Sequence, residues 1–212
     1  MKAKSIAPMV MSAALSACSV VGIRSGTPEP KYSVIGHVGT IEIRRYAPRI
    51  AAETTIAGSA EHARYQGFRR LAGYIFGGNK ARAKIAMTAP VAQSASEKIA
   101  MTAPVAQSAA GAGAWTIRFF MPPGYTMETL PVPNDPQVHL VPVPPETYAV
   151  LRFSGVPSPA AVAREQARLL AALKSSLWQP DGEPTAWFYD PPWTIPFLRR
   201  NEAAVPVKRE PG

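Results

Sequence analysis

The sequence has a single cysteine, Cys18, among 212 residues. One thiol cannot form an internal disulfide, and it leaves no cysteine cluster to hold a metal. No apolar run approaches the roughly 20 residues that a membrane-spanning helix needs, and the mean hydropathy is close to zero, at -0.03. These absences exclude a disulfide-stapled domain, a thiolate metal site and a polytopic membrane protein.

The signatures of common catalytic sites are also missing. The chain has no Gly-x-Ser-x-Gly elbow and no His-Glu-x-x-His helix, and no Gly-rich phosphate loop follows a predicted strand. The histidines His37, His62 and His139 lack the spacing of metal ligands. Glu42 and Glu53 lie on neighbouring predicted strands, but solvated strand faces explain them as well as a catalytic pair does. We expect a binding protein rather than an enzyme.

Positive charge is abundant but dispersed. The 23 Lys and Arg residues outnumber the 14 Asp and Glu residues, which gives a net charge of +9 without a long basic run. Proteins that bind nucleic acids usually concentrate such charge in a stripe or a recognisable reading motif. We therefore expect no nucleic-acid partner, and an anionic small ligand or an anionic lipid surface fits the dispersed charge better.

The N-terminus has the pattern of a lipoprotein signal peptide. Lys2 and Lys4 precede a modest apolar stretch over residues 6–14, and residues 15–18, Leu-Ser-Ala-Cys, resemble a bacterial lipobox. In that motif small residues admit the signal peptidase and the thiol receives the lipid. The alternative is an ordinary secretory leader with a chance cysteine. The pattern predicts a signal peptide over 1–18 that ends at a lipidated Cys18.

The residues after the cysteine predict location and domain limits. Ser19, rather than Asp, follows Cys18, and the lipoprotein resemblance then implies sorting to the outer membrane. Residues 19–30 contain Gly, Ser and Pro and have the composition of a flexible tether. We expect the folded domain over 31–207 and a tail over 208–212. The protein is thus expected in the bacterial cell envelope, lipid-anchored to the outer membrane and facing the periplasm.

One segment occurs twice in tandem: residues 84–97 are repeated almost unchanged from 98 to 110. Generic core packing does not explain this near identity, because cores tolerate many hydrophobic swaps. Each copy begins with a β-like Ile-x-Met-Thr and continues with a proline that stops ladder pairing. The repeat predicts two neighbouring short strands or a duplicated hairpin arm. We expect its methionines, Met87 and Met101, to pack in the core rather than line a pocket.

Strand and helix patterns alternate along the rest of the chain. Ser59 as N-cap and the glycines at 77–78 delimit one amphipathic helix, and Ser158 followed by Pro159 begins a second. Strand periodicity is expected over 33–38, 40–46, 49–56, 115–121, 139–143, 148–153, 185–190 and 195–207. Strands, helix and strands occur in this order twice. This order predicts an α+β fold with antiparallel sheets and two helices.

Several motifs in sequence order resemble the SOUL haem-binding protein family. They are Tyr46–Arg49, Gly67–Asn79, Lys84–Val91, Arg152–Gly155 and Tyr189–Trp193 with the following Leu198–Glu202. The resemblance covers about residues 31–207. It implies a distorted antiparallel β-barrel of two pseudo-symmetric halves, each with one long helix. It also implies binding of haem or a free porphyrin.

The resemblance further implies a ligand site on the first helix. A porphyrin needs a flat apolar slot and cations for its two propionates. The residues expected at this site are Arg64, Tyr65, Phe68, Arg69, Leu71 and Ile75. Arg70 is a further cation on the same helix. The alternative is that the apolar residues form core and the arginines form a solvated face.

An iron ligand does not carry over from the family. Some members have a histidine where this chain has Arg45, so the weak remaining candidate is His62, one turn before Tyr65. Near the C-terminus we expect a buried arginine that bridges Glu202 or Asp190 rather than one that contacts ligand. Two other functions stay open: a binder of another small amphipathic ligand on the same scaffold, and a tetrapyrrole-modifying enzyme.

Overall fold

A computed structural model describes residues 27–81, 96–111 and 113–210. Cys18, the predicted signal peptide and nearly all of the first repeat copy lie outside these residues. Among the residues that are described, no helix is both long and apolar enough to cross a bilayer.

The elements follow the order predicted from the sequence. The helices are α2 (Ala60–Ile75), α3 (Pro159–Leu173) and the short 3-10 helix η1 (Pro196–Leu198). The strands are β1 (Tyr32–Val38), β2 (Ile41–Tyr46), β3 (Arg49–Ala57), β4 (Asn79–Lys80), β5 (Val105–Ala109), β6 (Ala114–Phe120), β7 (Val132–Pro133), β8 (His139–Val143), β9 (Glu146–Phe153), β10 (Trp178–Pro180), β11 (Thr185–Phe188) and β12 (Asn201–Arg209).

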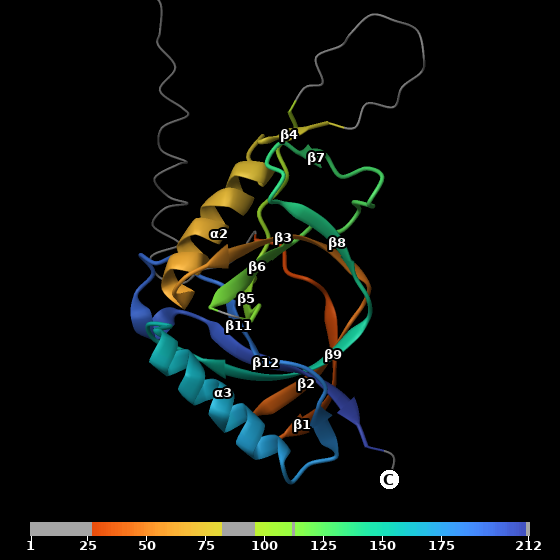
Figure 1. The fold of residues 1–212 in the computed structure, drawn as a ribbon. Helices are drawn as coiled ribbons and strands as arrows, with labels where there is room; N and C mark the ends of the chain where they lie inside the picture. The colour runs from red at the N-terminus through yellow and green to blue at the C-terminus, as the bar shows by residue number, and fades with distance from the viewer. Residues whose placement is uncertain (1–26, 82–95, 112, 211–212) are drawn as a thin grey trace, which may run out of the picture.

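One large antiparallel sheet dominates the molecule and is strongly curved (Figure 1). Its strand order is β1-β2-β9-β12-β11-β5-β6-β3-β8, with β10 paired to β12, and β4 pairs separately with β7. Helix α2 packs on β3 and β6, and α3 packs on β9 and β12. The predicted α+β class with antiparallel strands and two helices is confirmed. No pairing within the described strands joins β1 to β8, so closure into a barrel remains a prediction.

Helix α2 forms where its caps and its apolar face predict it. The Ser59 hydroxyl accepts a hydrogen bond from the His62 amide at 3.2 Å, and Gly77 ends the helix with a φ of 116° that favours glycine. The residues buried against the sheet are Ala63, Gly67, Leu71, Tyr74 and Ile75. The buried residues recur every three or four positions, so one face of the amphipathic helix packs on the sheet.

Helix α3 repeats this arrangement in the second half of the chain. The Ser158 hydroxyl accepts from the Ala161 amide at 3.2 Å, and Pro159 occupies the first turn. Leu169 and Leu173 are fully buried and share a hydrophobic core with residues of β2, β9 and β12. Each helix thus covers a different part of the sheet with its own hydrophobic core.

The second repeat copy contains a strand, but not at the predicted place. Residues 98–104 are irregular, and β5 begins only after Pro104. Pro104 lacks an N–H for a ladder, so pairing starts at Val105 and continues between β11 and β6. Instead of pairing, Ile99 donates its amide to the Ile75 carbonyl at 2.8 Å and is buried beside α2. The strand predicted at the Ile-x-Met-Thr start of this copy is therefore wrong, and the strand lies after the proline instead.

Two further segments differ from their predicted boundaries. The strand predicted over 195–207 is interrupted, because Pro196 and Leu198 lie in η1 and β12 begins at Asn201. At its other end β12 reaches Arg209, two residues into the predicted tail. The end of the predicted tether also contacts the domain, since the Pro28 carbonyl accepts from the Ala103 amide at 3.0 Å.

Candidate functional site

The exposed side of α2 holds part of the residue set predicted to bind ligand. Tyr65 is 62% exposed and Phe68 is 37% exposed, and the Phe68 ring packs edge-on against Phe119 with centroids 5.4 Å apart. Leu71 and Ile75 instead have 0% and 1% of their surface exposed and belong to the core below α2. They fill the space themselves, so the exposed apolar surface of the helix here consists of Tyr65 and Phe68.

The predicted cations lie at different sides of α2. Arg64 donates from Nη1 to the Pro157 carbonyl at 3.2 Å, and its guanidinium lies 4.7 Å from the centroid of the Phe188 ring. Burial lowers the pKa of Arg64. Arg69 lies over the ring of Tyr65 at 5.8 Å.

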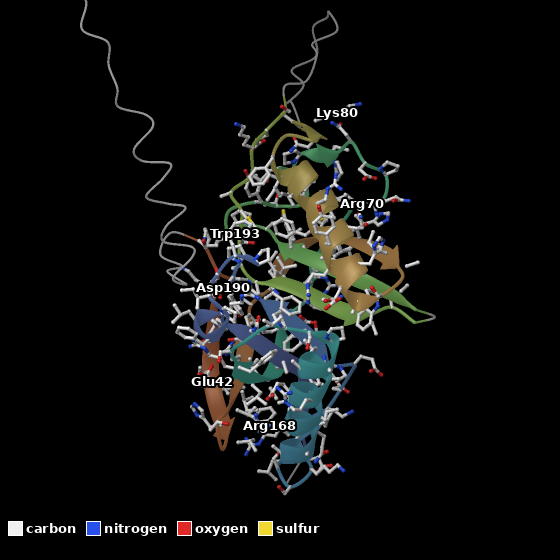
Figure 2. All side chains as sticks on the ribbon, turned by 90° about the vertical axis from the view of Figure 1, so that its left-hand side faces the viewer. Glu42, Arg70, Lys80, Arg168, Asp190 and Trp193 are labelled. Carbon is white, nitrogen blue, oxygen red and sulfur yellow. The ribbon has the colours of Figure 1, made fainter. Side chains whose placement is uncertain are left out.

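Arg70 belongs to the opposite side of the helix. Its Nη1 donates to the Thr54 hydroxyl at 3.0 Å, and its Nε lies 3.1 Å from Asp135. Figure 2 shows Arg70 and Trp193 on opposite sides of the upper part of the molecule. Arg70 therefore stabilises the contact of α2 with the sheet, and Arg64 and Arg69 are the cations near Tyr65 and Phe68.

Two loops beside Arg64 expose apolar side chains that the sequence analysis missed. The Gly155 amide donates to the Pro196 carbonyl at 2.9 Å, which joins the loop after β9 to η1. In these loops Val156 is 58% exposed and Phe197 is 72% exposed. The only sequence signal was an aromatic residue in a Pro-rich turn. We call Arg64, Tyr65, Phe68, Val156 and Phe197 the α2 flank.

Arg199 fixes the shape of the loop that carries Phe197. Its Nε donates to the Thr194 carbonyl at 2.7 Å, and its Nη2 donates to the Pro192 carbonyl at 2.6 Å. Leu198 and Trp193 in the same loop are also exposed. These hydrogen bonds hold the loop in one conformation, so its exposed apolar side chains form a defined surface next to the first turns of α2.

The predicted bridging arginine near the C-terminus is confirmed as Arg200. Its Nη2 lies 2.9 Å from Glu202, and its backbone amide donates to Asp190 at 2.6 Å. Arg44 donates to both Glu202 oxygens at 2.8 and 3.1 Å, and the Tyr189 hydroxyl donates to Glu202 at 2.7 Å. Glu202 is fully buried and has all these donors around it.

This network sets the charge state of Glu202. Burial alone would raise the pKa of its carboxyl group, but the hydrogen bonds and charges of Arg44 and Arg200 and the Tyr189 hydroxyl outweigh burial and lower it. Burial also raises the pKa of the nearby Tyr46 to about 12. The cluster therefore holds an ionised carboxylate and a protonated phenol at neutral pH, which is a structural arrangement rather than an acid–base pair.

A small pocket lies on the inner side of the sheet, away from the cores below the helices. Its lining is Glu29, Pro30, Tyr32, Tyr46, Arg49, Pro104, Phe120, Trp187 and Tyr189. The volume open to the centre of a water molecule is about 10 Å³, the space of about one water. Arg49 lies between two of the rings, 4.4 Å from the Tyr46 centroid and 4.5 Å from the Phe120 centroid.

The histidines show no metal site within the described ranges. No group of three or more His, Cys, Asp or Glu side chains there is placed to hold an ion. His62 is exposed in the first turn of α2, and its backbone amide is used by the Ser59 cap. It keeps its predicted place one turn before Tyr65 and remains a weak candidate.

The sequence profile of the SOUL heme-binding protein family matches residues 27–206. The chain belongs to this family. The match includes the whole α2 flank and the inner pocket, so both lie within the SOUL domain. No curated protein matches the chain in a sequence search.

Solved structures share the fold of this SOUL domain at very low sequence identity. The C-terminal domain of EcmrR has a TM-score of 0.55 and 9% identity, over 84% of this chain and 99% of that one. EcmrR in a DNA complex has a TM-score of 0.51 and 8% identity, over 80% and 57%. A hydrolase from Listeria innocua has a TM-score of 0.50 and 14% identity, over 86% and 93%. At such identities the likeness shows the fold alone.

Proposed function

We propose that the protein binds haem or a related tetrapyrrole on the α2 flank, in the bacterial cell envelope. The observation that carries this proposal is the exposed pair Tyr65 and Phe68 on α2 beside Arg64, in a chain of the SOUL family. Aromatic side chains offer flat apolar area to a macrocycle. Membership in the SOUL family supports the ligand class, and the exposed aromatic residues support this location.

The loops beside Arg64 extend this apolar surface. Phe197 and Val156 are more than half exposed, and the hydrogen bond from Gly155 to Pro196 holds their loops together. A macrocycle that covers Phe68 and reaches these loops would remove all of this apolar surface from water, which is the main favourable term in such binding. We infer that binding occurs across this open face.

The propionates would be held by guanidinium groups. Arg64 donates to a neutral partner, the Pro157 carbonyl, and Arg69 lies over the ring of Tyr65. Arginine donors bind carboxylates through charge-assisted hydrogen bonds. Arg64 and Arg69 are thus the residues proposed to contact propionates, and His62 is the proposed candidate for the iron.

With the segment 28–30 in place, the inner pocket is too small for a macrocycle. Its volume of about 10 Å³ is far below the roughly 300–1,000 Å³ of typical ligand pockets. The rings around it pack on each other, with Tyr148 and Trp187 centroids 5.1 Å apart. The proposal therefore keeps the predicted helix and puts the ligand on its exposed face, because Leu71 and Ile75, two of the residues expected to line the slot, are buried.

Titration of the protein with haemin, followed by the Soret band, tests the proposal. Phe68→Ser removes the central ring of the flank, and we expect haemin affinity to fall about tenfold, the equivalent of about 1.4 kcal/mol. Phe76→Ser is the matched control, because Phe76 is 59% exposed at the end of the same helix but lies outside the flank. Equal losses in both variants, or none in Phe68→Ser, would contradict the proposed site.

Metal-free protoporphyrin separates the alternatives for the iron. Equal affinity for haemin and protoporphyrin would show that iron ligation adds nothing to the binding free energy. A Soret band unchanged in His62→Ala would exclude His62 as the iron ligand. The protein is proposed to have no catalytic activity of its own. Formation of a product from haemin under reductant would overturn that part of the proposal.

The envelope location rests on the predicted lipobox. We propose that Cys18 carries a lipid that anchors the protein to the outer membrane, facing the periplasm. Metabolic labelling with palmitate should label the wild-type protein and leave Cys18→Ser unlabelled. Unchanged labelling in the variant would exclude the anchor while leaving the ligand proposal intact.

A further inference from the structure

The segment 28–30 lies across the inner pocket like a strap. Glu29 and Pro30 line the pocket, and the Pro28 carbonyl accepts from the Ala103 amide at 3.0 Å. The two Glu29 oxygens accept from Arg200 Nη1 at 3.1 and 3.2 Å. A carboxylate from the strap therefore lies at the rim of the pocket, where an ion pair and a backbone hydrogen bond hold the strap.

The floor of the pocket has donors without acceptors. The Nη2 of Arg49 donates to Glu146 at 2.8 Å, but Nε and Nη1 of Arg49 are buried without a hydrogen-bond partner. They are the only buried side-chain nitrogen or oxygen atoms of this kind in the described part of the chain. The Arg49 side chain is 8% exposed. Burying charged donors without acceptors is costly, so the pocket lacks an oxygen that would complete it.

The charged groups around the pocket limit which ligands could provide an acceptor for Arg49. The groups are Arg44, Arg49, Arg118, Arg200, Glu29, Glu42, Glu53, Glu146 and Glu202. Carboxylates already outnumber guanidinium groups in this set, so one more anion would not be favoured by charge alone. An anion that takes the place of Glu29 leaves the balance unchanged. The charge balance is therefore kept when a ligand carboxylate enters as the Glu29 carboxylate leaves.

The aromatic residues that line the pocket determine which kind of apolar group it can bind. Tyr46, Phe120 and Trp187 form a cluster of aromatic rings, with Tyr46 and Trp187 edge-to-face at 5.7 Å. Aromatic walls favour a flat apolar group. With the strap in place the space holds about one water molecule, so such a group enters only when the strap leaves.

We propose that the inner pocket is a second binding site, for small aromatic carboxylic acids, which the strap covers while Glu29 pairs with Arg200 at the rim. The ligand carboxylate accepts hydrogen bonds from the unpartnered Nε and Nη1 of Arg49 and replaces the negative charge that leaves with Glu29, and the ring of the acid lies against the aromatic wall. The strap then moves away from the pocket. This site is separate from the α2 flank and does not depend on haem binding.

Benzoate is the probe that tests the site, with its binding followed by calorimetry on the mature protein. In Glu29→Gln the strap loses its charge, and benzoate should bind about tenfold tighter than in the wild type. Glu183→Gln, a change in an exposed loop, should leave the wild-type affinity unchanged. Benzamide, which has the same shape without the charge, should not bind.

Arg49→Met in the Glu29→Gln background should abolish benzoate binding. Because Arg49 is buried, this variant can fail to fold, and the NMR signal of the Arg49 Nε–H in Glu29→Gln then serves as the second readout: benzoate should shift it. Equal benzoate affinity in wild type and Glu29→Gln, binding that survives Arg49→Met, or an unmoved Nε–H signal would overturn the proposal.

Haemin titrations of the same variants keep the two proposals apart. Haemin affinity should be the same in the wild type and in Glu29→Gln, because Glu29 lies outside the α2 flank. Benzoate results that fail while haemin still binds would remove only the inner site. Loss of haemin binding by Phe68→Ser with benzoate binding intact supports both sites.

Discussion

Glu202 is at the centre of the buried ion-pair network that stabilises the fold. It is fully buried, and it pairs with Arg44 at 2.8 Å and Arg200 at 2.9 Å. Removal of one partner from a buried ion pair typically costs about 3–5 kcal/mol, because charges are left buried without compensation. The two arginines give Glu202 a structural role, as expected for the C-terminal segment from the sequence.

Glu202→Gln should lower the free energy of unfolding at pH 7 by about 3 kcal/mol or more, because two buried guanidinium groups lose their counter-charge. Chemical denaturation measures the change. Glu53→Gln is the matched control, since Glu53 pairs with the partly exposed Arg118 at 2.6 Å, and such a pair contributes about 0–1 kcal/mol. A similar small effect of both changes would contradict the role of Glu202.

The same carboxyl group predicts a pH dependence of stability. The pKa of Glu202 is lowered in the fold from its ordinary 4.5, so its ionised form stabilises the protein above about pH 4.5. That contribution is lost as the pH falls through the lower folded pKa. The stability difference between wild type and Glu202→Gln should therefore shrink below about pH 4.5. A difference that stays constant down to pH 2 would show that Glu202 does not titrate as described.

At the residue scale the sequence predicted that a buried arginine would bridge a carboxylate, but it did not predict all the arginines that are buried. It favoured a buried bridge by an arginine at the C-terminus, and Arg200 makes it. It could not identify Arg44 or Arg49, because a charged residue in an alternating strand has the same pattern whether it faces water or a polar interior. Only the curvature of the sheet decides that the inner face of β2 and β3 is enclosed.

At the scale of elements, the contact between α2 and β6 requires a glycine. A Cβ built on Gly67 would lie 2.4 Å from Cγ1 and 2.7 Å from Cβ of Ile117. Alanine is favoured over glycine in a helix by about 1 kcal/mol, but overpacking of a core costs about 1–3 kcal/mol. The branched Ile117 has no room to move in its fully buried place, so the clash outweighs the propensity.

Gly67→Ala should therefore lower the melting temperature, by several degrees for a loss of about 1–2 kcal/mol. Gly73→Ala is the control in the same helix, because a Cβ there meets nothing within 4 Å. This control should raise the melting temperature, since the helix gains about 1 kcal/mol of propensity. If both changes raise it alike, α2 does not approach β6 as closely as described.

The elements themselves were largely predictable from local chemistry. Ser59 and Ser158 cap the two helices as expected, and alternation located most of the strands. The second repeat copy was not predictable, because Pro104 separates its residues into a buried coil and a central strand. Whether Ile99 pairs with a strand or packs beside α2 depends on the place of α2, which no local pattern contains.

At the scale of the whole molecule, the fold separates two surfaces. The α2 flank lies outside the sheet, where α2 and the η1 loop meet, and the inner pocket lies on the other side of the sheet under the strap. The resemblance predicted the helix that carries the proposed haem site. It could not predict that Leu71 and Ile75 are core and that Val156 and Phe197 are exposed beside Arg64, because those loops join α2 only in three dimensions.

Paramagnetic broadening by haemin is the measurement that tests the central claim most directly. In amide NMR spectra, substoichiometric haemin should broaden signals of residues 64–69, 155, 156, 197 and 198, because the iron relaxes nearby nuclei. Gallium protoporphyrin, which is diamagnetic, should shift the same signals without broadening them. Broadening centred on Arg49 and Trp187 instead, or no localised effect, would contradict a haem site on the α2 flank.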